Sequence, residues 1–224
     1  QGTSLIPRAA GTSLAGQCVG EGIVVDVSRH FTEILEFNAK ESWVRVQPGV
    51  IRDELNRFLK EKGLFFSPVT STSNRAMIGG MVGNNSCGTN SIVYGTTRDH
   101  VLELKGFLSD GSPVTFRDLS PQAFQEKLKL DSLEGEVYRR LDTALSDADN
   151  QKHIREGFTK PSITRRNTGY ALDMMLNAEP FSSNGIQFNL SRLICGSEGT
   201  LAFITEAKLH LDPLPPKHNL LVAA

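Results

Sequence analysis

The chain lacks the features that mark several common protein classes. It has only three cysteines, Cys18, Cys87 and Cys195, with no CxxC spacing, which argues against a disulfide framework, a structural zinc site or an iron–sulfur cluster within it. Lys and Arg number 24 against 25 Asp and Glu, so no basic excess points to nucleic acid as a partner. No apolar run approaches the roughly 20 residues that span a bilayer.

Two familiar phosphate-binding motifs are also missing. No GxxxxGK[ST] occurs, which excludes a P-loop. No GxGxxG follows a predicted strand, so the usual dinucleotide fingerprint is absent. The chain is 39% hydrophobic and 22% charged over 224 residues, a balance that predicts a globular protein with a sizeable core, in one large domain or two small lobes.

What the sequence has instead is three separate glycine-bearing segments. They read PRAAGTSLAG (7–16), IGGMVGNNSCGTNSIVYG (78–95) and CGSEGTLAFITEA (195–207). Glycine accepts positive φ and lets a ligand approach the main chain, and successive free N–H groups in a loop form a concavity that suits an anion. Three such segments in one small chain predict a long ligand that the backbone holds at several points.

Each segment also has a purely structural alternative. In the first, main-chain N–H groups with Thr12 and Ser13 suit phosphate oxygens, whereas the alternative is a tight turn between strands. In the second, taken as a glycine-rich loop, the amide and hydroxyl groups of 84–86 suit the edge of a flat heteroaromatic ring; the alternative is a long surface loop. In the third, Glu198 lies between two glycines directly before a long strand; the alternative is a structural turn with a solvated carboxylate.

Hydrophobic periodicity predicts strands and helices in alternation. The expected elements are a buried strand at 22–28, a strand at 43–46, a helix over 51–59 that ends near Gly63, a hairpin over 101–116 around Asp110-Gly111, a helix from Ser120-Pro121, a second helical stripe at 137–145, and a long strand over 201–211. This order predicts an α+β fold. We expect two lobes: a small βα lobe, and a larger lobe with a mixed or antiparallel sheet flanked by helices.

Together and in this order, the three segments resemble the flavin-binding domain of the vanillyl-alcohol-oxidase-type FAD enzymes, also called the PCMH-type FAD-binding domain. Within that superfamily the resemblance is closest to the group of D-lactate dehydrogenase, the glycolate oxidase flavoprotein subunit and D-2-hydroxyglutarate dehydrogenase. RRNTGYALDMML (165–176) is similar to a segment of larger members, some of which carry a fused iron–sulfur region. The resemblance covers nearly the whole chain and implies FAD as the cofactor.

The resemblance also implies cofactor contacts, position by position. The FAD pyrophosphate is expected to contact Arg8, Ala9, Ala10, Gly11, Thr12 and Ser13, and the cofactor is expected to extend along Pro68 and Thr72. The diphosphate–ribityl region and the ring edge are expected to contact Gly79, Gly80, Asn84, Ser86 and Gly88. Glu198, Gly199 and Ile204 are expected to border the cofactor, with Ile204 near the adenine. Thr12 stands where covalent members have a histidine, so the resemblance implies dissociable FAD. Ala9-Ala10 stands where two glycines are common, which predicts strain if either alanine has positive φ.

The implied reaction removes a hydride from the α-carbon of a 2-hydroxy acid and delivers it to flavin N5, leaving a 2-keto acid. The sequence does not identify the catalytic base, because its five histidines show no HxxH or HxH pairing, and no metal site is expected. In this family the substrate arginines lie in a cap domain after the FAD domain. His210 is predicted at the surface, and Cys87 is expected to pack within the second segment although it can approach the flavin.

Two pairs of charged neighbours allow more than one role. Arg165 and Arg166 either reach a substrate or phosphate, or are solvated or ion-paired, and the second interpretation is preferred. Arg98 and Asp99 are expected to form a structural pair.

The domain prediction assigns residues 1–212 to the FAD-binding domain without its N-terminal part, with lobes of about 1–68 and 69–212. Residues 213–224 are expected to be a proline-rich linker and the beginning of an absent substrate or cap domain, with a strand starting at 220–222. We expect a cytoplasmic protein that contacts a membrane only through absent regions. The hydroxy acid and the electron acceptor are not specified by the sequence.

Other functions on this fold stay open on the sequence alone. They are a reductase similar to UDP-N-acetylenolpyruvylglucosamine reductase, an electron-transfer flavin subunit such as that of xanthine dehydrogenase, and a non-catalytic nucleotide-binding module. The segments RRNTGY and GSEGTL favour the hydroxy-acid group.

Overall fold

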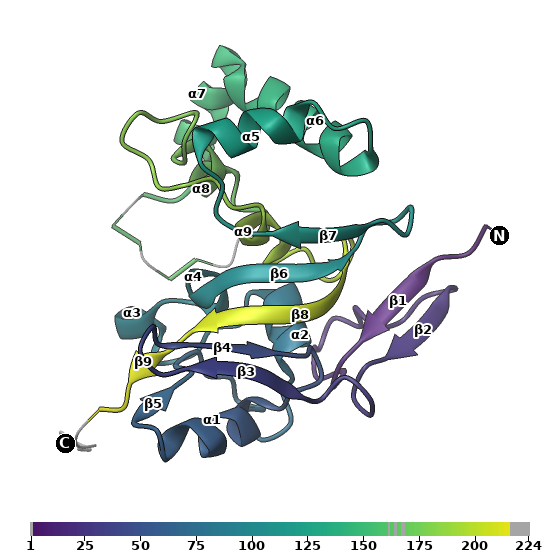
Figure 1. Ribbon diagram of the computed structural model, residues 1–224, viewed down its shortest axis with the longest axis vertical. Coiled ribbons are helices and arrows are strands. Elements are labelled where there is room, and N and C mark those ends of the chain that lie inside the picture. The colour runs from purple at the N-terminus through teal and green to yellow at the C-terminus, as the bar shows by residue number, and fades with distance from the viewer. Residues whose placement is uncertain (1, 161, 164, 167–168, 216–224) are drawn as a thin grey trace.

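A five-stranded antiparallel sheet forms the centre of the molecule (Figure 1). The computed structural model describes residues 2–160, 162–163, 165–166 and 169–215. The strand order is β3-β4-β8-β6-β7, where the strands are β3 (Ile34–Asn38), β4 (Trp43–Val46), β6 (Val101–Phe107), β7 (Pro113–Phe116) and β8 (Phe203–His210). All four neighbouring pairs are antiparallel. The sheet and the helices around it confirm the predicted α+β class.

The central strand, β8, joins early and late parts of the chain. It pairs with β4 on one side and with β6 on the other, so strands from both sides of residue 68 share one sheet. The division into lobes at that position stays a prediction. Ala207 and Leu209 on β8 are fully buried while His210 is exposed, as the alternation in the sequence predicted.

Helices cover one face of the sheet and extend past its edges. Helix α2 (Ile78–Asn84) packs against β8, and α9 (Ser191–Ile194) packs against β6. Helix α1 (Arg52–Lys60) lies beside β5 (Leu64–Phe65), with Gly63 at φ +70° between them. The predicted helix over 51–59 and its glycine stop are therefore confirmed. Strand β9 (Asp212–Pro213) pairs with β5.

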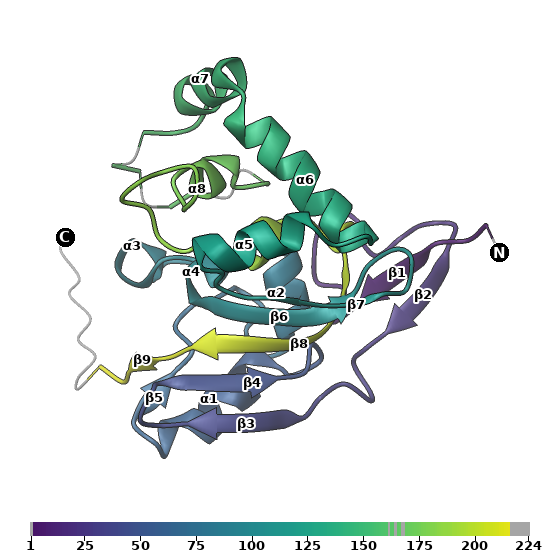
Figure 2. The ribbon, with the colours of Figure 1, turned by 45° about the horizontal axis from the view of Figure 1, so that its top comes forward.

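A helical insertion follows β7 and stands above that edge of the sheet (Figure 2). It contains α5 (Pro121–Leu128), α6 (Leu133–Ser146), α7 (Ala148–Gly157) and α8 (Leu172–Leu176). Ser120 caps α5, because its hydroxyl accepts the N–H of Ala123. An aromatic cluster of edge-to-face and tilted rings, with centroids 4.9–6.1 Å apart, holds the insertion together; its members are Phe124, Tyr138, Phe181 and Phe188.

The predicted buried strand at 22–28 is wrong in its burial. Strand β2 (Ile23–Asp26) pairs in parallel with β1 (Leu5–Arg8) as a two-stranded ribbon that projects from the body (Figures 1 and 2). The side chains of Ile23 and Val24 remain 55% and 46% exposed, because no layer covers a two-stranded ribbon. The apolar run predicted the strand correctly but not its environment.

The remaining part of the C-terminal prediction lies outside the described residues. Residues 216–224, which include the expected strand at 220–222 and the last linker proline, are not described. Two short helices complete the fold, α3 (Ser91–Tyr94) and α4 (Thr97–His100), both between α2 and β6.

Candidate functional site

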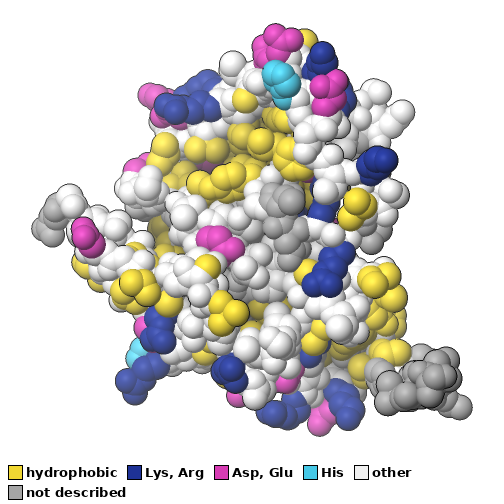
Figure 3. Space-filling model, turned by 180° about the vertical axis from the view of Figure 1, so that it is seen from behind, with side chains coloured by type: hydrophobic (Ala, Val, Ile, Leu, Met, Phe, Trp, Pro, Cys, Tyr) yellow, Lys and Arg dark blue, Asp and Glu magenta, His cyan; other side chains and the backbone are white. Residues whose placement is uncertain are grey.

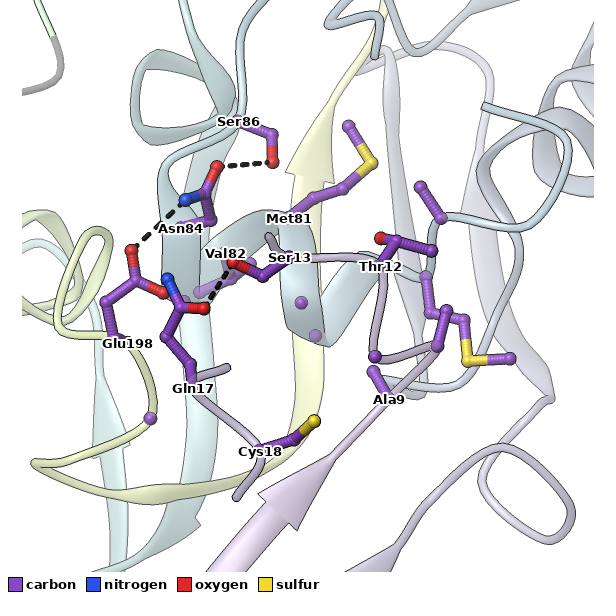
Figure 4. A pocket seen from close by; sticks show the side chains of 18 of the residues that line it. Ala9, Thr12, Ser13, Gln17, Cys18, Met81, Val82, Asn84, Ser86 and Glu198 are labelled. Carbon is purple, nitrogen blue, oxygen red and sulfur yellow. Dashed lines mark hydrogen bonds between the residues drawn. The ribbon is translucent and has the colours of Figure 1, made fainter. Parts of the chain in front are cut away.

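The three glycine-bearing segments wall one cavity of about 580 Å³. This volume falls within the roughly 300–1,000 Å³ of small-molecule pockets. Figure 4 shows the loop after β1, the helix α2 and the turn after α9 around it, and Figure 3 shows the molecule from behind as a space-filling surface. The predicted cofactor contacts on the cavity wall are Arg8, Ala9, Ala10, Gly11, Thr12, Ser13, Thr72, Gly79, Gly80, Asn84, Ser86, Glu198, Gly199 and Ile204.

Pro68 and Gly88 do not lie on the cavity wall. The carbonyl of Pro68 accepts the Nε–H of Arg52 at 3.0 Å. A Cβ at Gly88 would lie 2.3 Å from the carbonyl oxygen of Val69, so the glycine permits two stretches of backbone to pack. Both residues therefore shape the chain next to the cavity, and their direct contact with a cofactor stays a prediction.

The second segment begins as a helix, whereas the sequence suggested a loop. Ile78, Met81 and Val82 of α2 are buried in the core, and this packing outweighs the poor helix propensity of glycine. The helix ends at Asn85, which has φ 51° and donates its N–H to the carbonyl of Val82. A Cβ at Gly79 would lie 2.6 Å from Cβ of Pro48, so glycine is required for this packing.

The third segment is locked onto the end of that helix. The last carbonyls of a helix have no partner within it. Here the N–H of Gly196 donates to the carbonyl of Val82 at 3.1 Å, and the N–H of Glu198 donates to the carbonyl of Gly83 at 2.8 Å. Glu198 has φ 53°, an uncommon value for a residue with a side chain. The turn thereby places the Glu198 side chain at the cavity.

The first segment closes against both of the others. Gly199 has φ +76°, and a Cβ there would lie 2.9 Å from Cγ of Pro7; a Cβ at Gly80 would lie 3.6 Å from Cβ of Ala9. In the loop after β1, Gly11 has positive φ, but Ala9 and Ala10 do not. The strain considered for the two alanines is therefore absent.

The loop after β1 offers a row of free donors. Among the described residues, the main-chain N–H groups from Ala9 to Ser13 have no hydrogen-bond acceptor. Successive free N–H groups bind anions. By contrast, the N–H groups of Ile78 and Gly79 at the start of α2 donate to the carbonyls of Val50 and Pro48. The anion-binding capacity thus lies in the first loop rather than at the helix start, and it fits a diphosphate.

Few charges line the cavity. Its wall holds two arginines and one carboxylate, Glu198, and no histidine or lysine among the described residues. Arg8 pairs with Asp26 at 3.2 Å; hydrogen bonds from Ser28 lower the pKa of that carboxyl, and Arg8 contributes less. Arg165 is exposed and lies on the wall.

The neighbouring arginine behaves differently. Arg166 forms an ion pair with Asp173 on α8. The preferred interpretation of an ion-paired arginine is therefore confirmed for Arg166, whereas Arg165 shows no ion pair within the described part of the chain and is the candidate for an anionic ligand.

Arg98 holds together the backbone next to the cavity, a role that no sequence motif indicated. It is buried, and its guanidinium donates to the carbonyls of Arg192 at 2.8 Å, Gly169 at 2.6 Å and Cys195 at 2.5 Å. Burial lowers its pKa. The expected pairing with Asp99 is wrong, because that carboxylate instead accepts the N–H and hydroxyl of Thr96 in a capping box.

None of the three cysteines forms a disulfide. Burial raises the pKa of Cys195 to about 12, so its thiol stays neutral. Cys18 and Cys87 line the cavity. No cluster of three potential metal ligands occurs among the described residues. Within the same residues, no helix is both long and apolar enough to cross a membrane.

A family model described as FAD binding domain matches residues 1–117, just over half of the chain. The chain belongs to this family. Its cofactor is accordingly FAD, in agreement with the resemblance and with the donor loop.

Curated relatives extend the match. The chain is 45% identical over 210 residues to D-2-hydroxyglutarate dehydrogenase of Pantoea ananatis (strain AJ13355), covering 93% of this chain and 20% of the relative. It is 41% identical to the enzyme of the same name from Escherichia coli (strain K12), with 96% and 20% coverage. Glycolate oxidase subunit GlcD of Bacillus subtilis (strain 168) is 28% identical, with 98% and 34% coverage. The chain thus spans about a fifth of the length of the first two relatives.

Among solved structures, an alkyldihydroxyacetonephosphate synthase superposes with a TM-score of 0.59 at 18% identity, covering 96% of this chain and 28% of that one. At this identity the likeness concerns the fold, which is the predicted one. Sequence reasoning missed several wall residues that have no polar signature, including Val27, Met77, Met81, Ile194 and Ala202.

Proposed function

We propose that this chain is the FAD-holding part of an enzyme that oxidises a D-2-hydroxy acid to the 2-keto acid. The observation that carries the proposal is that all three glycine-bearing segments wall the same cavity, in a chain 41–45% identical to proteins named D-2-hydroxyglutarate dehydrogenase. The relatives named for glycolate and D-lactate support the same class of substrate, a small 2-hydroxy acid.

In this proposal the residues of the chain bind and orient the cofactor. FAD, when bound, supplies a hydride acceptor at flavin N5. The N–H groups of Ala9–Ser13 hold the diphosphate, while α2 and the Glu198 turn form the adjoining parts of the wall and exclude water from the ring and ribityl chain. Thr12 offers a hydroxyl rather than an imidazole, so FAD is held without a covalent bond.

The proton-accepting base and the substrate cations belong to other parts of the enzyme, in the predicted cap domain. The finer predictions form part of the same proposal: a fused iron–sulfur region outside this chain, and a cytoplasmic protein that contacts a membrane only through such regions. The electron acceptor is left unspecified.

Two measurements test the proposal. A ligand that binds only the native state raises thermal stability, so saturating FAD raises the melting temperature of the purified chain, whereas riboflavin at the same concentration raises it less. In the full-length protein, D-2-hydroxyglutarate and D-lactate are compared with NADPH as reductants of the flavin. Absence of any shift with FAD, or reduction by NADPH alone, would overturn the proposal.

A further inference from the structure

Two arginines line the cavity within the described part of the chain, and they differ in their partners. Arg8 pairs with Asp26 at 3.2 Å, and its side chain lies over the first loop, because its Nε would be 3.1 Å from a Cβ at Gly11. Arg165 is exposed and forms no ion pair or hydrogen bond with the described residues. The guanidinium of Arg165 is therefore a positive charge on the wall that this part of the chain does not neutralise.

The segment that carries Arg165 is anchored beside the cavity. The next residue, Arg166, forms an ion pair with Asp173 on α8. A Cβ at Gly196 would lie 2.9 Å from the carbonyl oxygen of Gly169, so the same segment packs directly against the start of the third glycine-bearing segment. These contacts place Arg165 at the wall and leave its own side chain available to a ligand.

The surroundings of Arg165 favour a carboxylate as that ligand. A guanidinium presents paired N–H donors that match the two oxygens of a carboxylate. Part of the wall is apolar, as at Met77 and Ile194, and opposite charges attract each other more strongly beside such a surface than in bulk water. The carboxylate of Glu198, also on the wall, instead accepts Nδ2 of Asn84 at 3.1 Å.

The proposed reaction brings two kinds of anion into the cavity. One is the diphosphate of FAD, for which the N–H groups of Ala9–Ser13 form a site of their own. The other is the carboxylate that every 2-hydroxy acid carries next to its reacting carbon. Arg165 lies between α7 and α8 in the helical insertion, outside all three glycine-bearing segments, and so adds a second anion site to the first.

We propose that the guanidinium of Arg165 binds the carboxylate of the 2-hydroxy acid, so that this chain contributes to substrate recognition as well as to FAD binding. This inference rests on the proposed function and deepens it, since it adds one cation of the FAD-holding part to those expected in the predicted cap domain. Arg165 holds the substrate and takes no part in the transfer of its proton or hydride.

The first test measures steady-state kinetics of the full-length enzyme with saturating FAD. Arg165→Met removes every donor, and Arg165→Lys restores the charge without the paired donors. We expect the KM for the hydroxy acid, D-2-hydroxyglutarate or D-lactate, to rise about 10- to 100-fold in the methionine variant and less in the lysine variant, with kcat changed by less than about threefold. Arg155→Met is the matched control with wild-type KM, because Arg155 is an exposed arginine on α7 that does not line the cavity.

The second test measures binding without turnover. The 2-keto acid product is titrated into the oxidised full-length enzyme, and the flavin absorbance reports its affinity, which should fall in Arg165→Met by the same factor as KM rises. The affinity of the full-length apoenzyme for FAD, measured by flavin fluorescence, should stay at the wild-type value. Unchanged FAD affinity also shows that the variant has folded.

Two results would overturn the inference and leave the proposed function intact. One is wild-type KM and wild-type product affinity in Arg165→Met. The other is a loss of FAD affinity as large as any rise in KM, or larger, which would make Arg165 a ligand of the FAD phosphates. A full-length enzyme that oxidised no 2-hydroxy acid would overturn the proposed function, and the inference with it.

Discussion

At the scale of single residues, Gly199 carries the closest contact between the first and third segments. Its φ is +76°, and a Cβ at this position would lie 2.9 Å from Cγ of Pro7, which leaves no room for a side chain. We predict that Gly199→Ala destabilises the chain by about 1–3 kcal/mol, since strain and overpacking add, and weakens FAD binding. The midpoint of urea unfolding measures the first effect.

Gly157 provides the matched control for that substitution. It ends α7, has no positive φ, and a Cβ there meets no atom within 4 Å. Gly157→Ala is expected to be neutral or stabilising by up to about 1 kcal/mol, through the unfolded state. Equal unfolding midpoints for the two variants would show that the Gly199 contact with Pro7 has no structural importance.

The same scale shows how far single residues can be interpreted from sequence. Glycines identified the segments because glycine has few other reasons to recur beside hydroxyl and amide residues. The roles of Pro68 and Gly88 were harder to predict, because a glycine needed for backbone packing, as at Gly88 against Val69, has the same sequence signal as one that contacts a ligand. The supporting role of Arg98 had no signal at all, since its partners are main-chain carbonyls.

At the scale of elements, Arg98 on α4 connects that helix to α9 and to the segment before α8. Its guanidinium on α4 holds the carbonyls of Arg192 and Cys195 around the end of α9, and that of Gly169 before α8. Arg98→Met keeps the length of the side chain but leaves these carbonyls without donors. We predict a loss of about 3 kcal/mol in unfolding free energy, together with a loss of FAD affinity as the Glu198 turn loosens; urea unfolding and flavin fluorescence measure the two effects.

Arg140 on α6 serves as the comparison for Arg98. Its side chain is 80% exposed and pairs with Glu136 one turn away. Arg140→Met should change stability by no more than about 0.5 kcal/mol. A loss of similar size in both variants would indicate that Arg98 contributes only as a charge.

The sequence-based predictions differ most from the structure in the type and burial of two elements. The glycines of α2 suggested a loop, yet Ile78, Met81 and Val82 are buried on one helical face. The run at Ile23–Asp26 suggested a buried strand, yet it lies in an uncovered ribbon. In both cases tertiary packing, which a single sequence does not display, decided the outcome.

At the scale of the whole molecule, two buried neutral groups predict loss of stability at high pH. Burial raises the pKa of Cys195 from 9.0 to about 12 and raises that of Tyr138 from 10.0. Between its unfolded and folded pKa, each group ionises only in the unfolded chain. The contribution of Cys195 is therefore fully present below about pH 9 and that of Tyr138 below about pH 10, and above these values each falls by about 1.4 kcal/mol per pH unit.

Tyr138→Phe separates the two contributions. The Tyr138 hydroxyl has no hydrogen-bond partner within the described part of the chain, so its removal is expected to be neutral or stabilising at pH 7. Above pH 10 the variant should lose stability with a slope smaller by about 1.4 kcal/mol per pH unit. Urea unfolding from pH 8 to pH 11 measures this, and parallel slopes for the variant and the wild type would refute the assignment to Tyr138.

Also at this scale, three distant segments of the chain are expected to surround one FAD molecule, with the main-chain amides of the first loop on its diphosphate. Hydrogen exchange of the chain with and without saturating FAD tests this most directly, because the amides of Ala9–Ser13 have no acceptor among the described residues. We predict slowed exchange at 9–13 together with slowed exchange at 79–86 and 198–204. Saturation with FAD that leaves the exchange of 9–13 unchanged would contradict it.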